Sequence, residues 1–214
     1  GCRIGRCSGG GRERVAGRGE RSAGGASDPE IDMADAPVLR ALLRISHAVL
    51  RANYFDEALE VIAEQAQVAL GAASVSISRW EPDTDVRTLI NVGGLGPPGE
   101  KRWPEAEIYD VSEDGPVMSL LRHGQPYVFS LDDEAANPPT EAAWLRSIGK
   151  QSELAVPIMY EDVMWGELWA SGVDGRRFGP DDVQLLQAIA AHAAVAIGRS
   201  ELFSTVWRFA HQDP

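Results

Sequence analysis

Cysteine is nearly absent from this sequence. The chain has 214 residues and two cysteines, Cys2 and Cys7, both within its first few residues. The rest of the chain therefore offers no disulfide framework, no Cys-rich zinc site and no cysteine nucleophile. We also find no Ser/His/Asp arrangement that would form a catalytic triad and no cluster with metal-ligand spacing, so we expect no catalytic residues and no metal.

Long apolar runs and excess basic charge are missing too. No run approaches the roughly 20 residues of a membrane span, and the Arg- and Gly-rich N-terminus lacks the apolar core of a signal peptide. We therefore expect a cytoplasmic chain. The 32 Asp and Glu against 20 Lys and Arg give a formal net charge of −12. Because nucleic acids and anionic membranes attract basic surfaces, this balance argues against both as partners.

The length and the local patterns predict one domain with short extensions. Residues 1–32 are rich in Gly and Arg with few aliphatic side chains, so we expect a disordered tail there. Residues 33–203 carry the patterns of a folded domain. Apolar spacing of three to four residues predicts helices over 37–50, 55–70 and 181–209, and shorter helices over 114–122 and 138–148. Alternation predicts strands over 74–80, 86–92 and 127–129 and a hairpin of 153–160 with 163–173.

The last strand of that hairpin has two unlike faces. By strict period two, Gly166, Leu168 and Ala170 share one face with Met164, and small residues there suit the packing of helices. The opposite face carries Trp165, Glu167 and Trp169, as expected for a pocket or a partner surface. In the strand over 74–80, Ser76, Ser78 and Trp80 share a face in the same way.

Three segments near the C-terminus resemble the GAF domain family. They are SELAVPI at 152–158, WGELW at 165–169 and FGPDD at 178–182, and they lead into the apolar helix that contains Leu185 and Ile197. The resemblance implies a GAF/PAS-like α/β (α+β) fold: an antiparallel sheet of five or six strands, with N- and C-terminal helices on one face and a small-molecule pocket on the other. It also implies a sensory, regulatory domain that controls an output domain and is not itself an enzyme.

The end of the chain resembles a second family. The segment WRFAHQDP at 207–214 is similar to the lead-in of a GGDEF diguanylate cyclase domain, an enzyme of cyclic di-GMP signalling. A histidine-kinase phosphoacceptor helix around His211 and an ordinary tail are the competing interpretations. We expect residues 204–214 to be the end of a signalling helix that leads to an output domain outside this sequence. Apolar residues continue along this helix to Phe209, so we expect a homodimer through the terminal helices.

Aromatic and polar side chains on the expected pocket face are the ligand candidates. They are Ser76, Ser78, Trp80, His123, Trp144, Trp165, Glu167 and Trp169. A mostly apolar pocket with a few polar groups is the usual composition of a ligand site. The alternative is that the Trp side chains fill space and that the domain serves only as a dimerisation scaffold.

The sequence does not name the ligand, but the resemblance bears on three cofactors. Bilin attachment in the family uses a Cys, which the folded part lacks, and haem-binding members use a His in a stretch that here spans residues 131–150 and has none. The sequence therefore argues against bilin and haem. Family members that bind cyclic nucleotides show Asn-Lys where this chain has Asp174-Gly175. The resemblance therefore also argues against a cyclic nucleotide.

Overall fold

The computed structural model describes residues 36–52, 54–81, 85–94, 101–105, 107–110, 115–133 and 139–211. The expected tail over 1–32, the first residue of the helix expected over 114–122 and the terminal Asp213-Pro214 lie outside these ranges, as do the side chains of residues 204–211. The elements in chain order are α1 (Ala36–Arg51), α2 (Phe55–Leu70), β1 (Ser74–Trp80), β2 (Asp85–Gly93), β3 (Ile108–Asp110), α3 (Pro116–Arg122), β4 (Tyr127–Ser130), α4 (Pro139–Ser147), β5 (Ser152–Tyr160), β6 (Val163–Gly172) and α5 (Pro180–His211).

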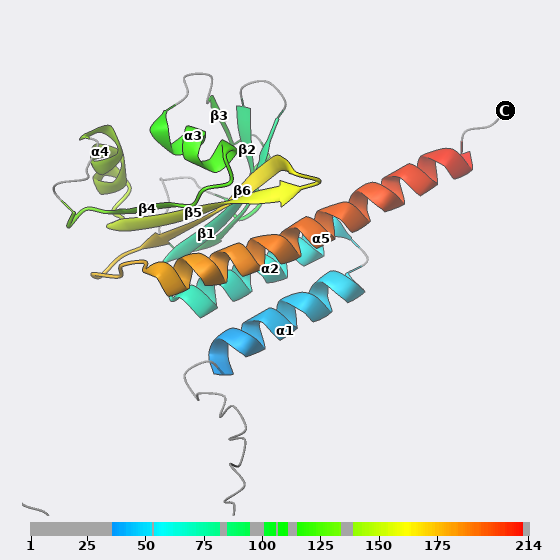
Figure 1. The fold of residues 1–214 in the computed structure, drawn as a ribbon, viewed down its shortest axis with the longest axis horizontal. Coiled ribbons are helices and arrows are strands. Elements are labelled where there is room, and N and C mark those ends of the chain that lie inside the picture. The colour runs from blue at the N-terminus through cyan, green and yellow to red at the C-terminus, as the bar shows by residue number, and fades with distance from the viewer. Residues whose placement is uncertain are drawn as a thin grey trace, which may run out of the picture. The chain divides into compact units, whose positions relative to one another are not determined.

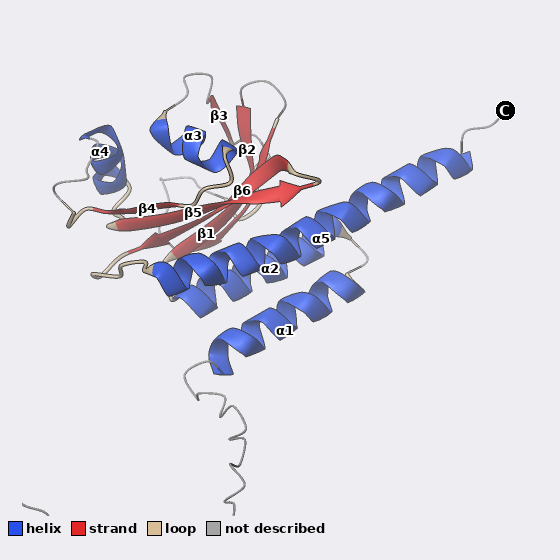
Figure 2. Ribbon diagram, in the orientation of Figure 1, coloured by secondary structure: helices blue, strands red, loops and turns tan. Residues whose placement is uncertain are grey.

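The strands form one antiparallel sheet in the order β3-β2-β1-β6-β5-β4. The pairing of β1 with β6 brings the first and last strands together at the centre of the sheet. The helices α1, α2 and α5 cover one face, and the short helices α3 and α4 lie over the other (Figures 1 and 2). This arrangement confirms the fold class expected from the sequence.

The main hydrophobic core lies between the sheet and the three long helices. Its fully buried members include Ile62 of α2, Ile77 of β1, Leu168 of β6 and Leu186 of α5. Burial of one such side chain stabilises the fold by roughly 1.5–3 kcal/mol. A smaller cluster on the opposite face joins α3 and α4 to β4, β5 and β6. The sheet thus separates two apolar layers.

Two β-bulges interrupt the alternation of faces in this sheet. In the β5–β6 pair, Ile158 opposes Gly166 and Met159 opposes Met164, so Trp165 has no partner. In the β1–β2 pair, Ile77 opposes Ile90 and Ser78 opposes Thr88, so Leu89 is the extra residue. An extra residue shifts the side-chain alternation by one position along the bulged strand. The strict period-two assignment of residues 164–170 therefore fails at the bulge.

The start of α5 is anchored by a network around Arg176. Its Nε donates to the Leu70 carbonyl at 2.9 Å, and its Nη2 lies 2.5 Å from Oδ1 of Asp182. The other carboxylate oxygen of Asp182 accepts a hydrogen bond from the Gly179 backbone N–H at 2.8 Å. These contacts cap the helix at the end where its dipole favours negative charge, as expected from the acids at 181–182. The loop after β6, the end of α2 and the first turn of α5 are consequently held together.

Candidate functional site

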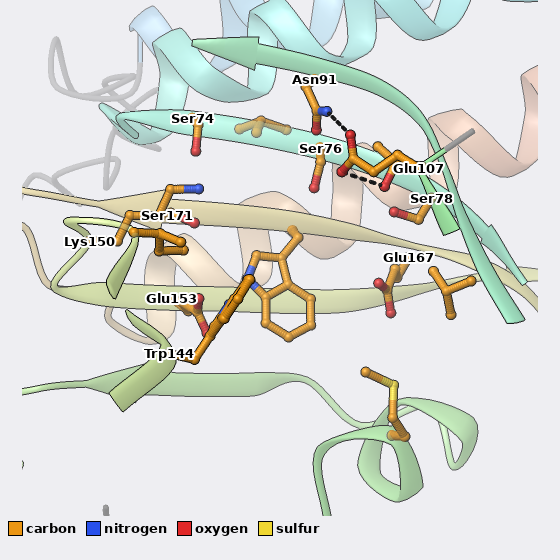
Figure 3. A pocket seen from close by; sticks show the side chains of 16 residues that line it. Ser74, Ser76, Ser78, Asn91, Glu107, Trp144, Lys150, Glu153, Glu167 and Ser171 are labelled. Atoms are coloured by element: carbon orange, nitrogen blue, oxygen red, sulfur yellow. Dashed lines mark hydrogen bonds between the residues drawn. The ribbon is translucent and has the colours of Figure 1, made fainter. Parts of the chain in front are cut away.

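A cavity of about 340 Å³ lies on the sheet face opposite the long helices. Its floor comes from β1, β2, β5 and β6, and its other walls from α3, α4 and the segments before β3 and β5 (Figure 3). The residues that line it are Ser74, Val75, Ser76, Ser78, Val86, Thr88, Asn91, Glu107, Met118, Trp144, Ile148, Lys150, Glu153, Glu167, Trp169 and Ser171. The volume is near the lower end of the range usual for small-molecule sites, so it suits a compact ligand.

Strand register arranges the floor in three cross-strand rows. The first row is Ser74, Ser171 and Glu153; the second is Asn91, Ser76, Trp169 and Ala155; the third is Thr88, Ser78 and Glu167. Opposed residues in antiparallel strands have Cβ atoms about 4.5–5.5 Å apart, so each row is a continuous strip of side chains. The floor is therefore polar, with one indole, that of Trp169, at its centre.

Glu167 is the carboxylate of the third row, and it is only 5% exposed. Oε2 accepts a hydrogen bond from the indole Nε1–H of Trp80 at 3.2 Å. Burial raises the pKa of Glu167 to about 7, and the hydrogen bond from Trp80 offsets only part of that rise. Near neutral pH this carboxyl therefore changes its protonation state with small changes in its surroundings.

Trp80 contacts Glu167 but is not among the residues that line the cavity. The guanidinium carbon of Arg122, at the end of α3, is 5.0 Å from the centroid of the Trp80 ring, within the range of a cation–π contact. Trp80 thus connects the buried carboxyl to α3, which also places Met118 on the cavity wall. The sequence prediction put Trp80 in the ligand-contacting set; in the structure it supports a residue of that set.

A second carboxylate, Glu107, closes the cavity beside β2. Its Oε1 accepts a hydrogen bond from Thr88 Oγ1 and its Oε2 from Asn91 Nδ2, both at 3.1 Å. The Thr88 backbone N–H also donates to the Glu107 carbonyl at 3.0 Å. Each carboxylate oxygen of Glu107 is thus held by a neighbouring side chain, and the group is fixed in place (Figure 3).

The opposite end of the cavity carries Lys150 and Glu153, which are 8% and 5% exposed. Lys150 follows α4 and Glu153 belongs to β5, while Trp144 of α4 stands at the mouth with half of its surface exposed. Figure 3 shows Lys150, Glu153 and Ser171 at one end and Glu167 with Ser78 at the other. The two ends therefore present different charge arrangements to a ligand.

Five of the eight ligand candidates named from the sequence line this cavity: Ser76, Ser78, Trp144, Glu167 and Trp169. His123 does not. It is exposed at the end of α3, where its Nδ1 lies 2.7 Å from the Ser119 carbonyl oxygen. Because the turn at His123 and Gly124 directs the side chain back along the helix, it caps the helix end and does not reach the cavity.

The prediction that Trp165 lies on the cavity face of the sheet is wrong. It was expected beside Glu167 and Trp169, but it packs against the helix-side core, with its ring centroid 6.0 Å from that of Phe55 in an edge-on contact. The bulge at Trp165 is the physical reason, since it reverses the side of the sheet on which the preceding residues lie. Met164, expected on the helix side, joins the cavity-side cluster instead.

Several wall residues were missed by the sequence interpretation. Ser74, Ser171 and Glu153 follow from simple alternation along their strands and could have been named. Thr88 and Asn91 were obscured by the bulge at Leu89, which places both on one face at an odd spacing. Glu107 and Lys150 lie outside the strands, and no local pattern indicates them.

The described part of the chain contains no group of three His, Cys, Asp or Glu side chains that could hold a metal ion. Among its helices, none combines the length and the apolar character that crossing a membrane requires.

Comparison with known proteins places this fold and cavity in a family. Residues 55–197 match the GAF domain. The phycoerythrobilin-bound GAF domain from a cyanobacterial phytochrome is 18% identical with a TM-score of 0.66, over 79% of this chain and 99% of that one. The GAF domain from a phosphoenolpyruvate-protein phosphotransferase of Coxiella burnetii is 17% identical with a TM-score of 0.61, over 79% of this chain and 98% of that one. At these identities the likeness shows the fold alone.

The expectation that a bilin is disfavoured is wrong. Solved structures with this fold include the phycoerythrobilin-bound domain and a far-red-absorbing protein with bound biliverdin, 17% identical with a TM-score of 0.61 over 75% of this chain and 99% of that one. The argument from the sequence rested on the missing cysteine. That absence excludes a thioether bond in the folded part of the chain, but it does not exclude a bilin held without a covalent bond.

The family match covers well over half of the chain, and the fold is shared with solved GAF domains. The chain therefore belongs to the GAF domain family.

Proposed function

We propose that this chain is the sensory domain of a dimeric signalling protein, in which a small molecule in the cavity controls an output domain through α5. The resemblance of residues 207–214 to the start of a GGDEF domain supports a diguanylate cyclase as that output. The domain itself then regulates, and the catalytic step belongs to the output domain.

The observation that carries this proposal is the two-sided construction of β6. Glu167, Trp169 and Ser171 line the cavity, while the alternating Leu168 and Ala170 are completely buried in the core shared with α5. A ligand that shifts β6 on one face therefore shifts the packing surface of α5 on the other. Coupling of this kind requires a ligand that binds two arrangements of the element with different affinity.

The length of α5 supports the dimer. The helix runs for 32 residues, from Pro180 to His211, and its backbone continues beyond the sheet (Figure 1). Among the described side chains of α5, Ala196 and Ile197 are the last within the core, and beyond them Leu202 and Phe203 are 64% and 69% exposed. A parallel pair of such helices would place two output domains side by side, the arrangement that the family resemblance implies for a cyclase.

Insertions into α5 test the transmission of the signal. One to four residues are inserted, one length at a time, between Leu202 and Val206 of the full-length protein, and the synthesis of cyclic di-GMP is measured. Each added residue rotates the output domain by about 100°. We expect the activity to vary with the length of the insertion and to recover best near whole turns.

A matched series of insertions after Gly124, in the turn between α3 and β4, is the control and should not show this periodicity. If the activity were equal at all four insertion lengths in α5, the helix would not transmit a signal. The domain would then be a dimerisation scaffold, the second function that an exposed helix end supports.

A further inference from the structure

Glu167 has more capacity to accept hydrogen bonds than the surrounding protein uses. An ionised carboxylate offers about four lone-pair positions. Within the described part of the chain, the indole N–H of Trp80 is the one donor that reaches this carboxyl, and it occupies Oε2 alone. The residue is 5% exposed and faces the cavity. A buried charge in this position is stable only when a partner supplies further donors or an opposite charge.

The other charged groups on the wall do not supply that partner. Both carboxylate oxygens of Glu107 are already held, by Thr88 and Asn91. Lys150 is the one cationic side chain among the described residues of the wall, and it lies with Glu153 at the end of the cavity away from Glu167 (Figure 3). Arg122 stacks on the outer side of Trp80. The wall around Glu167 is therefore acidic, with no cation of its own against it.

Aromatic side chains line the same cavity as this carboxylate. Trp169 lies two residues farther along the same face of β6, and Trp144 reaches the cavity from α4. Indole faces attract cations, and they also stack on flat rings. A cavity lined by a carboxylate and by indole side chains suits a positively charged group carried on a flat apolar body. The cavity volume of about 340 Å³ suits a compact molecule.

From this geometry we infer that the cavity takes a compact organic cation, an amidinium, guanidinium or ring-borne ammonium, with Glu167 as its counter-ion. The inference rests on the proposed function, because it names the class of ligand for the same cavity. An anion would meet an acidic wall at this end, and a neutral ligand would leave the buried carboxyl without its missing donors.

The affinity of the cavity for a cation should depend on pH, because the cation pairs only with the ionised form of Glu167. Without a ligand, the pKa of Glu167 is about 7. Below that pH the carboxyl must therefore release its proton before it can pair with a cation. Glu107, Glu153 and Lys150 face the same cavity and set the background charge, and Arg122 lies beyond Trp80. The affinity for a permanent cation should therefore rise about tenfold between pH 6 and pH 8 and level off above.

Three probes of equal shape and different charge test the ligand class. Benzamidine is a cation, benzamide is neutral and benzoate is an anion. Calorimetric titration and thermal unfolding are measured with each, at pH 6, 7 and 8. We expect benzamidine to bind and raise the melting temperature, with the affinity rising as stated, and the other two to have no effect.

Variants assign the effect to one carboxylate. Glu167→Gln should weaken benzamidine binding at pH 8 at least tenfold and abolish its pH dependence. Glu105→Gln, a change at an exposed carboxylate outside the cavity, should alter neither. Glu153→Gln, at the other end of the cavity, should keep the preference for benzamidine over benzamide. If Glu167→Gln does not fold, the pH dependence in the unmodified protein still tests the inference.

Preference for benzoate or benzamide over benzamidine, or no binding of any of the three probes, would overturn the cation inference. So would a loss of the preference in Glu153→Gln but not in Glu167→Gln. None of these results bears on the proposed signalling function, which is tested separately by the insertions in α5.

Discussion

Two carboxylates of the same cavity show how local contacts determine what a residue can do. Glu107 has a hydrogen-bond donor on each oxygen, from Thr88 and from Asn91, and so forms part of the framework. Glu167 has one donor, Trp80, and is buried at the centre of the sheet. Both carboxylate oxygens of Glu107 thus accept hydrogen bonds from protein side chains, whereas Glu167 can still accept hydrogen bonds from a ligand or bind a proton.

The buried carboxyl makes the stability of the domain depend on pH. Burial raises the pKa of Glu167 from 4.5 to about 7, so the folded state binds the proton more tightly than the unfolded state does. The stability linked to this proton is complete below pH 4.5 and is lost as the pH rises through about 7. At roughly 1.4 kcal/mol per pKa unit, about 2–3 kcal/mol should be lost between pH 5 and pH 8.

Glu167→Gln should remove this loss, because glutamine does not titrate. The measurement is the free energy of unfolding in urea at pH 5 and pH 8, for the unmodified protein, for Glu167→Gln and for the exposed control Glu105→Gln. The control should follow the unmodified protein. Parallel pH profiles for all three proteins would contradict the prediction.

At the scale of the elements, the packing of β6 depends on the close approach of β1. Gly166 follows the bulge at Trp165 and is fully enclosed by the sheet. A Cβ at this position would lie 2.1 Å from the Ser78 carbonyl oxygen of β1, far inside the contact distance of the two atoms. The glycine is therefore required by space between two backbones and not by a left-handed conformation.

Gly166→Ala should accordingly destabilise the domain by about 1–3 kcal/mol, the usual range for an overpacked interior. Because β1 and β6 carry most of the cavity floor, the same change should weaken ligand binding. Gly94→Ala is the matched control, since a Cβ there meets nothing within 4 Å. Equal melting temperatures for the two alanine variants would show that β1 can move away from β6 without loss.

The bulges also mark where prediction from the sequence ends. Alternation gave the correct faces for Glu167, Leu168 and Trp169, because the strand is regular beyond Gly166. It failed at Trp165, because pairing with β5 inserts one residue that no local pattern reveals. The individual helices and strands followed from strong periodicity, and their arrangement into a sheet with long helices on one face followed from the resemblance to the GAF family. Glu107 and Lys150 reach the cavity through loops, whose paths depend on tertiary contacts.

At the scale of the whole molecule, the long helices leave an apolar surface uncovered. On α5, Leu202 and Phe203 are 64% and 69% exposed, and on α1 Leu43 and Leu50 are 53% and 68% exposed. Burial of such side chains against a second copy would contribute roughly 1.5–3 kcal/mol each. The surface lies on the two terminal helices, the elements through which we expect the homodimer to form.

Leu202→Asp should therefore weaken the homodimer, because it places a charge in that apolar contact. Light scattering of the purified chain at tens of micromolar should give the mass of a dimer for the unmodified protein and a lower mass for the variant. Leu120→Asp makes the same change at a 41%-exposed leucine of α3, on the other side of the sheet, and should leave the mass unchanged. A monomeric mass for the unmodified protein would exclude the dimer.

The sheet lies between the cavity and the helix core, so mutations on its two faces have different consequences. Residues such as Ile77, Ile158 and Leu168 hold the long helices, and changes there lower the stability of the whole domain. Ser76, Thr88 and Trp169 face the other way and contribute little to that core. Mutations can therefore retune which molecule is recognised while the scaffold and its helical connection persist. A lineage of such domains can diverge in what it detects without first losing the ability to fold.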